Sequence, residues 1–180
     1  MRKNKIKYEF YREPGGTKLS EDIRDILLDR RNDIDALTET VLFCSARSHL
    51  VSNKILPLID NNTYFIVCDR FIDSTVAYQS FGRGIDINLI HSLNKVVTSD
   101  ILPSTTFLLD CDMENSLKRM SKADRMEGSG SKFLEKVRQG YQSIKEMNPN
   151  RIISIDTNDS IDKISERIWG YFCKRYDYEF

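Results

Sequence analysis

The sequence predicts an α/β fold in which parallel strands alternate with helices. Three short apolar segments, at residues 64–68, 105–109 and 151–155, have the length and composition of buried strands. Segments with apolar residues at helical spacing separate them. A strand, a helix and a further strand in succession require a crossover connection, which is the connection that joins parallel strands.

The first third of the chain is predicted to form one strand and two helices before the first of these apolar strands. Lys7–Tyr11 has the pattern of a short strand and ends at a Pro-Gly-Gly turn. Leu19–Leu28 and the longer stretch Ile34–Ile59 carry apolar residues at helical spacing. Pro57 lies in the last turn of the second helix, and we expect it to weaken that turn because proline lacks an N–H. Tyr64–Cys68 is the first buried strand.

The remainder of the chain alternates in the same way. The predicted helices are Ile87–Val97, Met113–Met120, Phe133–Met147 and Ser160–Tyr176, and the predicted strands are Thr105–Leu109 and Arg151–Ile155. Asp112 has the side chain of an N-cap for the helix that starts at Met113, and the polar segment Ser121–Ser131 is predicted to be a loop. Because the sequence shows no repeat and no linker, residues 1–180 are predicted to form a single domain.

Composition and charge exclude several classes of protein. The 180 residues include 27 basic and 27 acidic side chains, so no net positive charge attracts a nucleic acid backbone. The apolar runs are much shorter than the roughly 20 residues of a membrane-spanning helix. We therefore expect no nucleic acid and no membrane among its partners. Cysteines at positions 44, 68, 111 and 173 form no CxxC pair, and core thiols in a reducing cytosol are the better interpretation.

Ligands of open α/β sheets bind beyond the carboxyl ends of the strands, which selects residues 12–17, 69–74 and 110–112. Residues 12–17 read Arg-Glu-Pro-Gly-Gly-Thr, and the glycines allow a ligand to approach the backbone closely. At the end of the next strand, Asp69 can bind hydrated Mg²⁺ and Arg70 can clamp phosphoryl oxygens. The alternatives are a turn with solvated charges and a simple ion pair between Asp69 and Arg70.

Other candidate residues lie on helices and loops. Phe43 and Arg47 share one helix face and can stack on a base and bond its edge, although a helical phenylalanine usually packs in the core. Tyr78 and Gln79 can line a sugar or base pocket, or they belong to an ordinary polar, glycine-bearing loop. The polar segment between two predicted helices contains three further basic residues, Arg119, Lys122 and Arg125. They can belong to a mobile lid that brings cations onto phosphates, and the alternative is a solvated basic face.

Together, the motifs occur in an order and spacing that resemble the thymidylate kinase family. The blocks that carry the resemblance are Arg-Glu-Pro-Gly-Gly-Thr at 12–17, Phe43 with Arg47, Asp69-Arg70-Phe71 with Asp73-Ser74, Ala77-Tyr78-Gln79, and Asp124-Arg125-Met126-Glu127. The resemblance runs from about Tyr11 to Asp156. It implies a three-layer P-loop nucleoside monophosphate kinase-like fold with a parallel sheet. It also implies a cytoplasmic enzyme that phosphorylates dTMP to dTDP with ATP and Mg²⁺, in dTTP biosynthesis, and that forms homodimers.

The resemblance further implies roles for the residues that would face the base and the sugar of dTMP. Phe43 would stack on thymine, and Arg47 would bond the edge of the base. Ser74 and Gln79 would lie near the base. Tyr78 would pack under the deoxyribose, where a 2′-hydroxyl would clash.

A second group of residues is implied to act on the phosphates. Arg12 and Arg70 would hold the phosphate of dTMP, with Asp69 near the metal ion and contacting it through water. Arg125 would reach the transferring phosphoryl group from a lid at about residues 119–131, in which further cations would face ATP, namely Arg119 and Lys122.

The family's phosphate-binding loop, G-x-x-G-x-G-K-[ST], does not occur in these 180 residues. By resemblance, the strand before that loop lies inside the sheet, between the strands that end at Cys68 and Leu109. Both strands would then lack a hydrogen-bonding neighbour, and unpaired buried backbone groups cost about 1–3 kcal/mol each. We therefore expect the chain that starts at Met1 to fold poorly or to turn over negligibly. Phosphorylation of dTMP by this chain at ordinary kinase rates would contradict that expectation.

Two alternative functions stay open at this point. One is a non-catalytic nucleotide-binding or partner-binding remnant, which predicts saturable dTMP binding without ATP turnover, or no binding. The other is a related deoxynucleoside or nucleotide kinase, which a panel of nucleoside and nucleotide substrates would distinguish.

Overall fold

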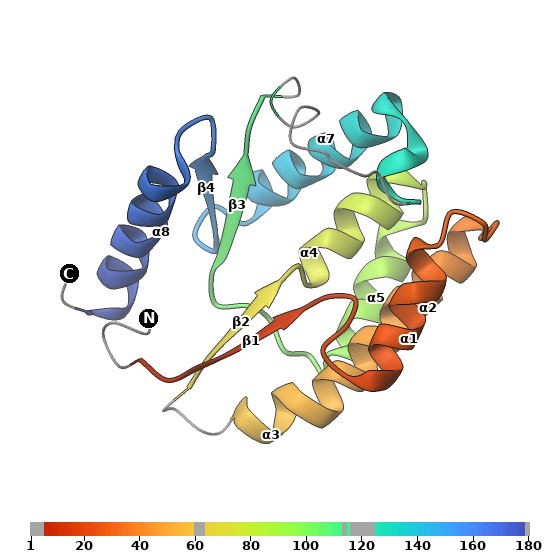
Figure 1. Cartoon of the computed structure of the whole chain (residues 1–180), viewed down its shortest axis with the longest axis horizontal. Coiled ribbons are helices and arrows are strands. Elements are labelled where there is room, and N and C mark those ends of the chain that lie inside the picture. The colour runs from red at the N-terminus through yellow and green to blue at the C-terminus, as the bar shows by residue number, and fades with distance from the viewer. Residues whose placement is uncertain (1–5, 60–63, 113–114, 116–124, 179–180) are drawn as a thin grey trace. The chain divides into compact units, whose positions relative to one another are not determined.

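The computed structural model describes residues 6–59, 64–112, 115 and 125–178, and it confirms the predicted α/β class with parallel strands (Figure 1). The chain divides into two compact units. The first comprises residues 1–102 and 124–144, and the second comprises residues 103–123 and 145–180. The predicted helix at Met113–Met120 falls almost wholly outside the described residues.

The sheet of the first unit consists of two parallel strands, β1 (Tyr8–Arg12) and β2 (Phe65–Asp69). Their register places Arg12 opposite Asp69, and the N–H of Glu13 continues the ladder by donating to the carbonyl of Asp69 at 2.9 Å. Both strands therefore end at the same edge, and both of the predicted phosphate-binding segments begin there.

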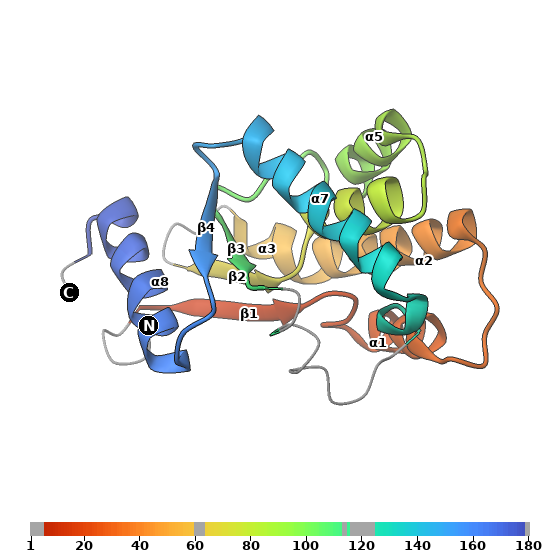
Figure 2. The same cartoon turned by 90° about the horizontal axis from the view of Figure 1, so that it is seen from above.

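Two helices follow β1 and lie side by side (Figures 1 and 2). Helix α1 (Lys18–Leu28) begins at Thr17, whose side chain accepts a hydrogen bond from the N–H of Ser20. Helix α2 (Ala36–Leu50) begins at Asp35, whose carboxylate accepts from two backbone N–H groups of the first turn.

The long helix predicted for Ile34–Ile59 is divided into three pieces. After α2, a π-helical turn spans Val51–Ile55, and the short helix α3 (Leu56–Ile59) follows. The widened turn ends two residues before Pro57, where a continuous α-helix would require the N–H that proline lacks. The proline therefore changes the helix before its own position and leaves one further turn intact.

The segment that the sequence presents as a polar loop, Ala77–Gly84, is mostly helical, which corrects the loop interpretation. Helix α4 (Ile72–Thr75) runs into a second π-helix over Val76–Gly82, which Arg83 closes by donating its N–H to the carbonyl of Tyr78 at 3.0 Å. Helix α5 then spans Ile87–Val97, as predicted.

Helix α7 (Ser131–Met147) packs closely on the second π-helix. A β-carbon added at Gly140 would lie 2.9 Å from the β-carbon of Phe81 and 3.0 Å from the α-carbon of Ala77. The glycine therefore permits an approach that a larger residue would prevent.

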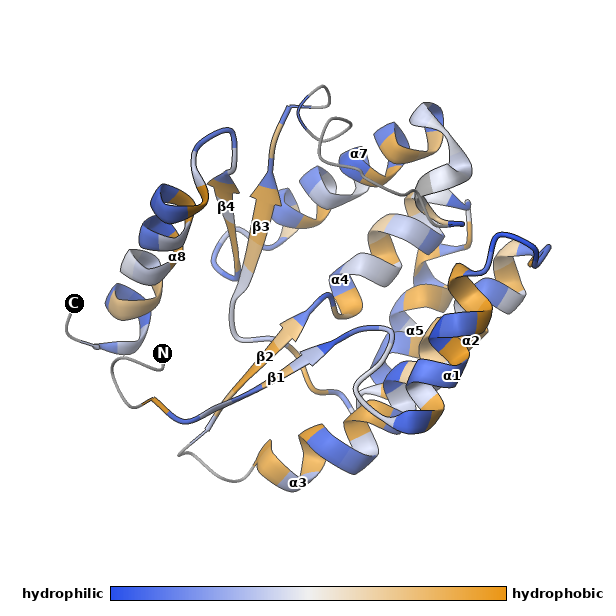
Figure 3. Cartoon of the chain, viewed as in Figure 1, coloured by the Kyte–Doolittle hydropathy of each residue, from blue (hydrophilic) through white to orange (hydrophobic). Residues whose placement is uncertain are grey.

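The second unit contains strands β3 (Thr106–Asp110) and β4 (Ile152–Asp156), which are parallel, and helix α8 (Ile161–Tyr176). Aromatic side chains of α8 pack on one another, with the rings of Trp169 and Phe172 stacked at 5.2 Å between centroids. Strands β2, β3 and β4 are apolar along most of their length, whereas β1 is mixed (Figure 3). Within the described residues, β2 pairs only with β1 and β3 only with β4, so neither has the second neighbour that the resemblance implies.

The core below the candidate site is formed where α2 passes into its π-turn. Leu50, Val51 and Ile55 are buried together, and the partly buried residues Tyr11, Ile66, Cys68, Phe71 and Ile101 pack on them.

Burial raises the pKa of the Cys68 thiol to about 12. None of the four cysteines forms a disulfide bond, and Cys44 and Cys173 are buried, whereas Cys68 and Cys111 are only partly buried. None of the helices in the described ranges has the length and apolar character required to cross a membrane.

Candidate functional site

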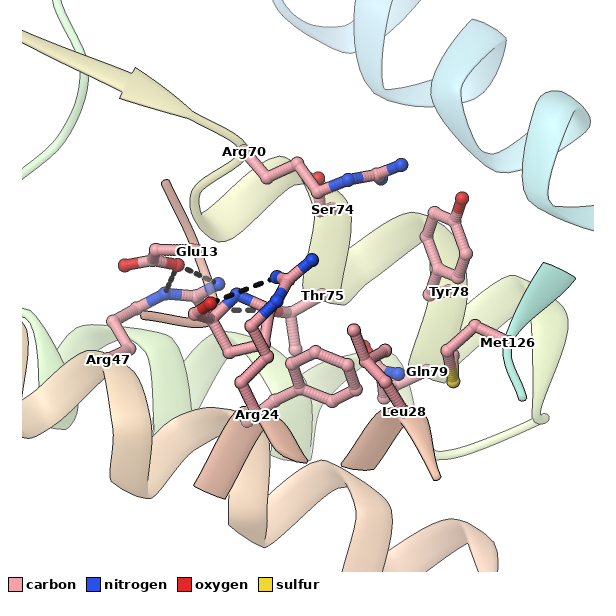
Figure 4. Close-up of a pocket in the computed structure, with 12 residues that line it drawn as sticks. Glu13, Arg24, Leu28, Arg47, Arg70, Ser74, Thr75, Tyr78, Gln79 and Met126 are labelled. Carbon is pink, nitrogen blue, oxygen red and sulfur yellow. Dashed lines mark hydrogen bonds and ion pairs between the residues drawn. The ribbon is translucent and has the colours of Figure 1, made fainter. Parts of the chain in front are cut away.

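A pocket lies at the carboxyl edge of the β1–β2 sheet, wholly within the first unit (Figure 4). Six residues proposed from the sequence line it: Phe43, Arg47, Arg70, Ser74, Tyr78 and Gln79. Six that the sequence interpretation left out complete the lining: Glu13, Pro14, Arg24, Leu28, Thr75 and Met126. Segments that are far apart along the chain therefore converge on one cavity.

Helix α2 supplies one wall of the pocket from residues spaced four apart. Glu39, Phe43 and Arg47 share a face of the helix because four residues approximate one turn. Phe43 lines the pocket, and the two residues on either side of it are buried charges. This arrangement places an aromatic ring between two fixed polar groups.

The guanidinium of Arg47 is only 3 % exposed and is the most extensively bonded group in the pocket. Its Nε and Nη2 both lie 2.7 Å from Oε2 of Glu13. Its Nη1 donates to Oγ1 of Thr75 at 2.6 Å and to Oδ1 of Asn94 at 2.9 Å. These contacts use four of the five N–H donors of an arginine and leave one for a ligand.

Glu13 is 4 % exposed and is only partly satisfied by this ion pair. Its Oε1 is buried and has no hydrogen-bond partner among the described residues. Burial raises the pKa of this carboxyl group, and the charge of Arg47 opposes that rise. One signal for this residue is visible in the sequence, namely its place beside Arg12 in the Arg-Glu-Pro-Gly-Gly-Thr motif. Its buried pairing with Arg47 is a tertiary feature.

Arg70 follows β2 and is held over an aromatic pair. Its backbone has a left-handed φ of 68°, which directs the chain from the strand into α4. Its guanidinium carbon lies 5.1 Å from the centre of the Tyr78 ring, and its Nη1 is 3.4 Å from the hydroxyl of Tyr141. The same hydroxyl lies 2.8 Å from Oγ of Ser74. Arg70 is nevertheless exposed to solvent, so its cationic end can meet an anion.

Gln79 forms the polar floor of the pocket together with a buried carboxylate. Its Nε2 donates to Oε1 of Glu39 at 3.0 Å, and Glu39 is completely buried. Arg83 and Arg125 also pair with Glu39, at 3.0 Å and 2.8 Å from its Oε2.

Three of the predicted site residues lie outside the pocket lining, and two more are not described. Arg12 pairs with Glu21 at 3.0 Å on the protein surface, and Asp69 is exposed at the end of β2. Arg125 is tied to Glu39 and donates from Nε to the carbonyl of Leu27 at 2.7 Å. Arg119 and Lys122 fall outside the described residues, so the proposed lid stays a prediction.

The metal prediction rests on a single carboxylate. In the part of the chain that the structure describes, no group of three or more His, Cys, Asp or Glu side chains could hold a metal ion. Mg²⁺ in kinase sites is usually bound through one or two carboxylates, water and substrate phosphates. The exposed carboxylate of Asp69 fits that donor set as one ligand.

The chemistry of the pocket suits a planar ring with a polar edge that carries an anionic group at some distance. Phe43 offers a flat apolar face, while Arg47, Thr75 and Gln79 offer donors and acceptors at its margin. Arg70 provides the cation for an anion. Thr75 could have been found from the sequence because it lies one helical turn before Gln79 in the same motif.

Comparisons with known proteins agree with this chemistry. A family model described as thymidylate kinase matches residues 1–168. A thymidylate kinase from Chlorobaculum tepidum is 41% identical over 169 residues, covering 87% of this chain and 78% of the relative. One from Kosmotoga olearia is 37% identical over 171 residues, covering 93% and 82%. A crystal structure of thymidylate kinase from Ehrlichia chaffeensis superposes with a TM-score of 0.73 at 29% identity, covering 92% of this chain and 81% of that one.

Replacement of Glu13 by alanine is expected to destabilise the fold, because it leaves the charge of Arg47 buried without a counter-ion. We expect the Glu13→Ala variant to lose about 3 kcal/mol of unfolding free energy, measured by urea denaturation. The control is Lys95→Ala, which removes an exposed ion pair with Asp100 and should leave the unfolding midpoint unchanged. Equal midpoints for Glu13→Ala and the wild-type chain would show that the buried pair does not stabilise the site.

Proposed function

This chain belongs to the thymidylate kinase family, and we propose that it binds dTMP in the pocket beside Phe43 as the acceptor of a phosphoryl group from ATP. The product is dTDP, and the reaction serves dTTP biosynthesis. The observation that carries this proposal is the convergence of Phe43, Arg47 and Gln79 on one cavity with Arg70 among its lining residues.

The base and the sugar account for most of the pocket. Phe43 stacks on thymine, and the free N–H of Arg47 bonds a carbonyl at the edge of the ring. Gln79 and Ser74 lie beside the base, and Tyr78 packs under the deoxyribose, where a 2′-hydroxyl would collide with its ring. Support for this assignment comes from the fixed position of Arg47, whose other donors are all engaged.

The phosphate of dTMP is held by Arg70 and Arg12. Phosphoryl transfer needs alignment and cations around the equatorial oxygens more than it needs covalent help from the protein. Arg70 is supported by Tyr78 and Tyr141 and exposes its guanidinium. Arg12, which pairs with Glu21 on the surface, has to exchange that partner for the phosphate.

Mg²⁺ and the remaining cations act on the ATP side of the reaction. When bound, Mg²⁺ neutralises charge on the phosphates, and Asp69 would hold it through water. Arg125 is assigned to the transferring phosphoryl group and, with Arg119 and Lys122, to a lid. Because Arg125 is paired with Glu39, its role requires that this ion pair opens.

Binding of dTMP by the chain is the direct test. We expect isothermal titration calorimetry to detect saturable binding, and Phe43→Ala to weaken it by about tenfold through the loss of stacking. Arg47→Ala should weaken it further, because Thr75 and Asn94 lose their common partner. Val96→Ala, at a 76 % exposed position on α5, is the control and should bind as the wild-type chain does.

The outcomes separate the candidate functions. Binding of dTMP together with formation of dTDP from ATP supports the kinase. Binding without turnover supports a nucleotide-binding protein that does not catalyse the transfer. A chain that is folded by circular dichroism and binds no dTMP would refute the assignment of the pocket.

We further propose a homodimer in the cytoplasm, because none of the cysteines forms a disulfide bond and reduced thiols are stable in that compartment. Exposed apolar side chains follow single faces of the two neighbouring helices, with Leu19 and Ile26 on α1 and Leu37 and Val41 on α2. A second copy of the chain can cover such a surface through a two-fold contact. We expect sedimentation velocity to show a dimer that Leu37→Glu disrupts, whereas Val96→Glu on α5 leaves it intact. A wild-type chain that sediments as a monomer would contradict the dimer.

A further inference from the structure

Glu39 is a charged residue with no exposed surface, and it lies outside the sequence blocks on which the family resemblance was based. It lies on α2 one turn before Phe43 and contacts Gln79, which lines the pocket. Burial of a carboxylate is costly unless donors replace its water. The donors around it therefore indicate what the residue does.

Four N–H groups surround the two oxygens of Glu39. Oε1 accepts from Nε2 of Gln79 at 3.0 Å and from Nε of Arg83 at 3.1 Å. Oε2 accepts from Nη2 of Arg83 at 3.0 Å and lies 2.8 Å from Nη2 of Arg125. A carboxylate offers about four acceptor positions, so Glu39 is saturated.

The contact with Gln79 determines which end of the Gln79 amide faces the pocket. A carboxylate only accepts hydrogen bonds, so the amide must turn its nitrogen toward Glu39. The carbonyl oxygen of the same planar group then points to another side, and Gln79 lines the cavity. A neutral partner at position 39 would allow either orientation.

We propose that Glu39 is a positioning residue that makes Gln79 present an acceptor to the base and thereby selects bases with a ring N–H. This inference rests on the proposed binding of dTMP. Thymine and uracil carry an N–H at N3 between two carbonyl groups, whereas cytosine carries a lone pair at N3. A fixed acceptor at this position accepts a hydrogen bond from the N3–H of thymine or uracil and repels the N3 lone pair of cytosine. Arg47 donates to the neighbouring carbonyl group of the base.

The two arginines balance the charge of Glu39 but do not set this selectivity. Arg83 is anchored independently, with its guanidinium carbon 4.3 Å from the centre of the Phe133 ring. It does not line the pocket, so its removal leaves the contact between Glu39 and Gln79 in place. Arg83 therefore provides a control within the same cluster.

The experiment compares dTMP, dUMP and dCMP as ligands of the wild-type, Glu39→Gln and Arg83→Gln chains by isothermal titration calorimetry. The wild-type chain is expected to prefer dTMP over dCMP, and Glu39→Gln should reduce that preference by about tenfold because Gln79 is free to turn. The ratio of dTMP to dUMP affinity should not change, since both bases present the same edge. Arg83→Gln should keep the preference for dTMP over dCMP.

Two results would overturn the inference. One is an unchanged ratio of dTMP to dCMP affinity in Glu39→Gln, including the case in which both affinities fall equally. The other is the absence of any preference for dTMP over dCMP in the wild-type chain. If Glu39→Gln does not fold, the double variant Glu39→Gln/Arg83→Gln removes one charge of each sign and is measured in its place, with the same expected ratio. A wild-type chain that binds none of the three nucleotides refutes the proposed function instead.

Discussion

The buried ion pair between Arg47 and Glu13 is the interaction on which the rest of the pocket depends. One guanidinium joins the end of β1, the helix α2 that carries it, Thr75 on α4 and Asn94 on α5. Its partners lie 28 to 47 residues away along the chain, so the pocket forms only after these elements have come together. Removal of one member of a buried pair leaves an uncompensated charge. The recognition of a ligand and the assembly of the first unit are therefore supported by the same group.

The two buried carboxylates near the pocket, Glu13 and Glu39, differ in how completely their hydrogen-bond acceptors are satisfied. Glu39 accepts from four donors, whereas Oε1 of Glu13 has no partner within the described residues. A saturated group in a low-dielectric site is rigid, while an unsatisfied one stores unfavourable free energy. The side of the pocket around Gln79 and Glu39 is therefore preorganised. Oε1 of Glu13, in the Arg-Glu-Pro-Gly-Gly-Thr motif, is the atom at which a new hydrogen bond from a water molecule or a ligand would be most favourable.

Local patterns in the sequence predicted most of the elements and about half of the pocket lining. The apolar strands followed from the length and composition of their apolar runs, because strands buried on both faces are continuously apolar, and the helix at Ile87–Val97 followed from its helical periodicity. The π-helix at Val76–Gly82 was missed because polar residues and a glycine are typical of loops, and only packing against α7 and α5 makes it helical. Glu13 and Glu39 were missed for a different reason. Their importance lies in hydrogen bonds to distant residues, and a single sequence does not record such partners.

The π-helix also restricts how the length of this segment can vary. Ser74 and Thr75 precede this π-helix, Tyr78 and Gln79 lie within it, and Arg83 follows it. Its geometry therefore determines the direction in which Thr75 points toward Arg47 relative to the directions in which Gln79 and Arg83 point toward Glu39. Each residue advances the side-chain direction by about 100° in an α-helix and by somewhat less in the wider π-helix. Loss of one residue would rotate everything downstream by roughly that angle and separate Arg83 from its carboxylate. Insertions and deletions between Thr75 and Arg83 should therefore be tolerated less well than substitutions.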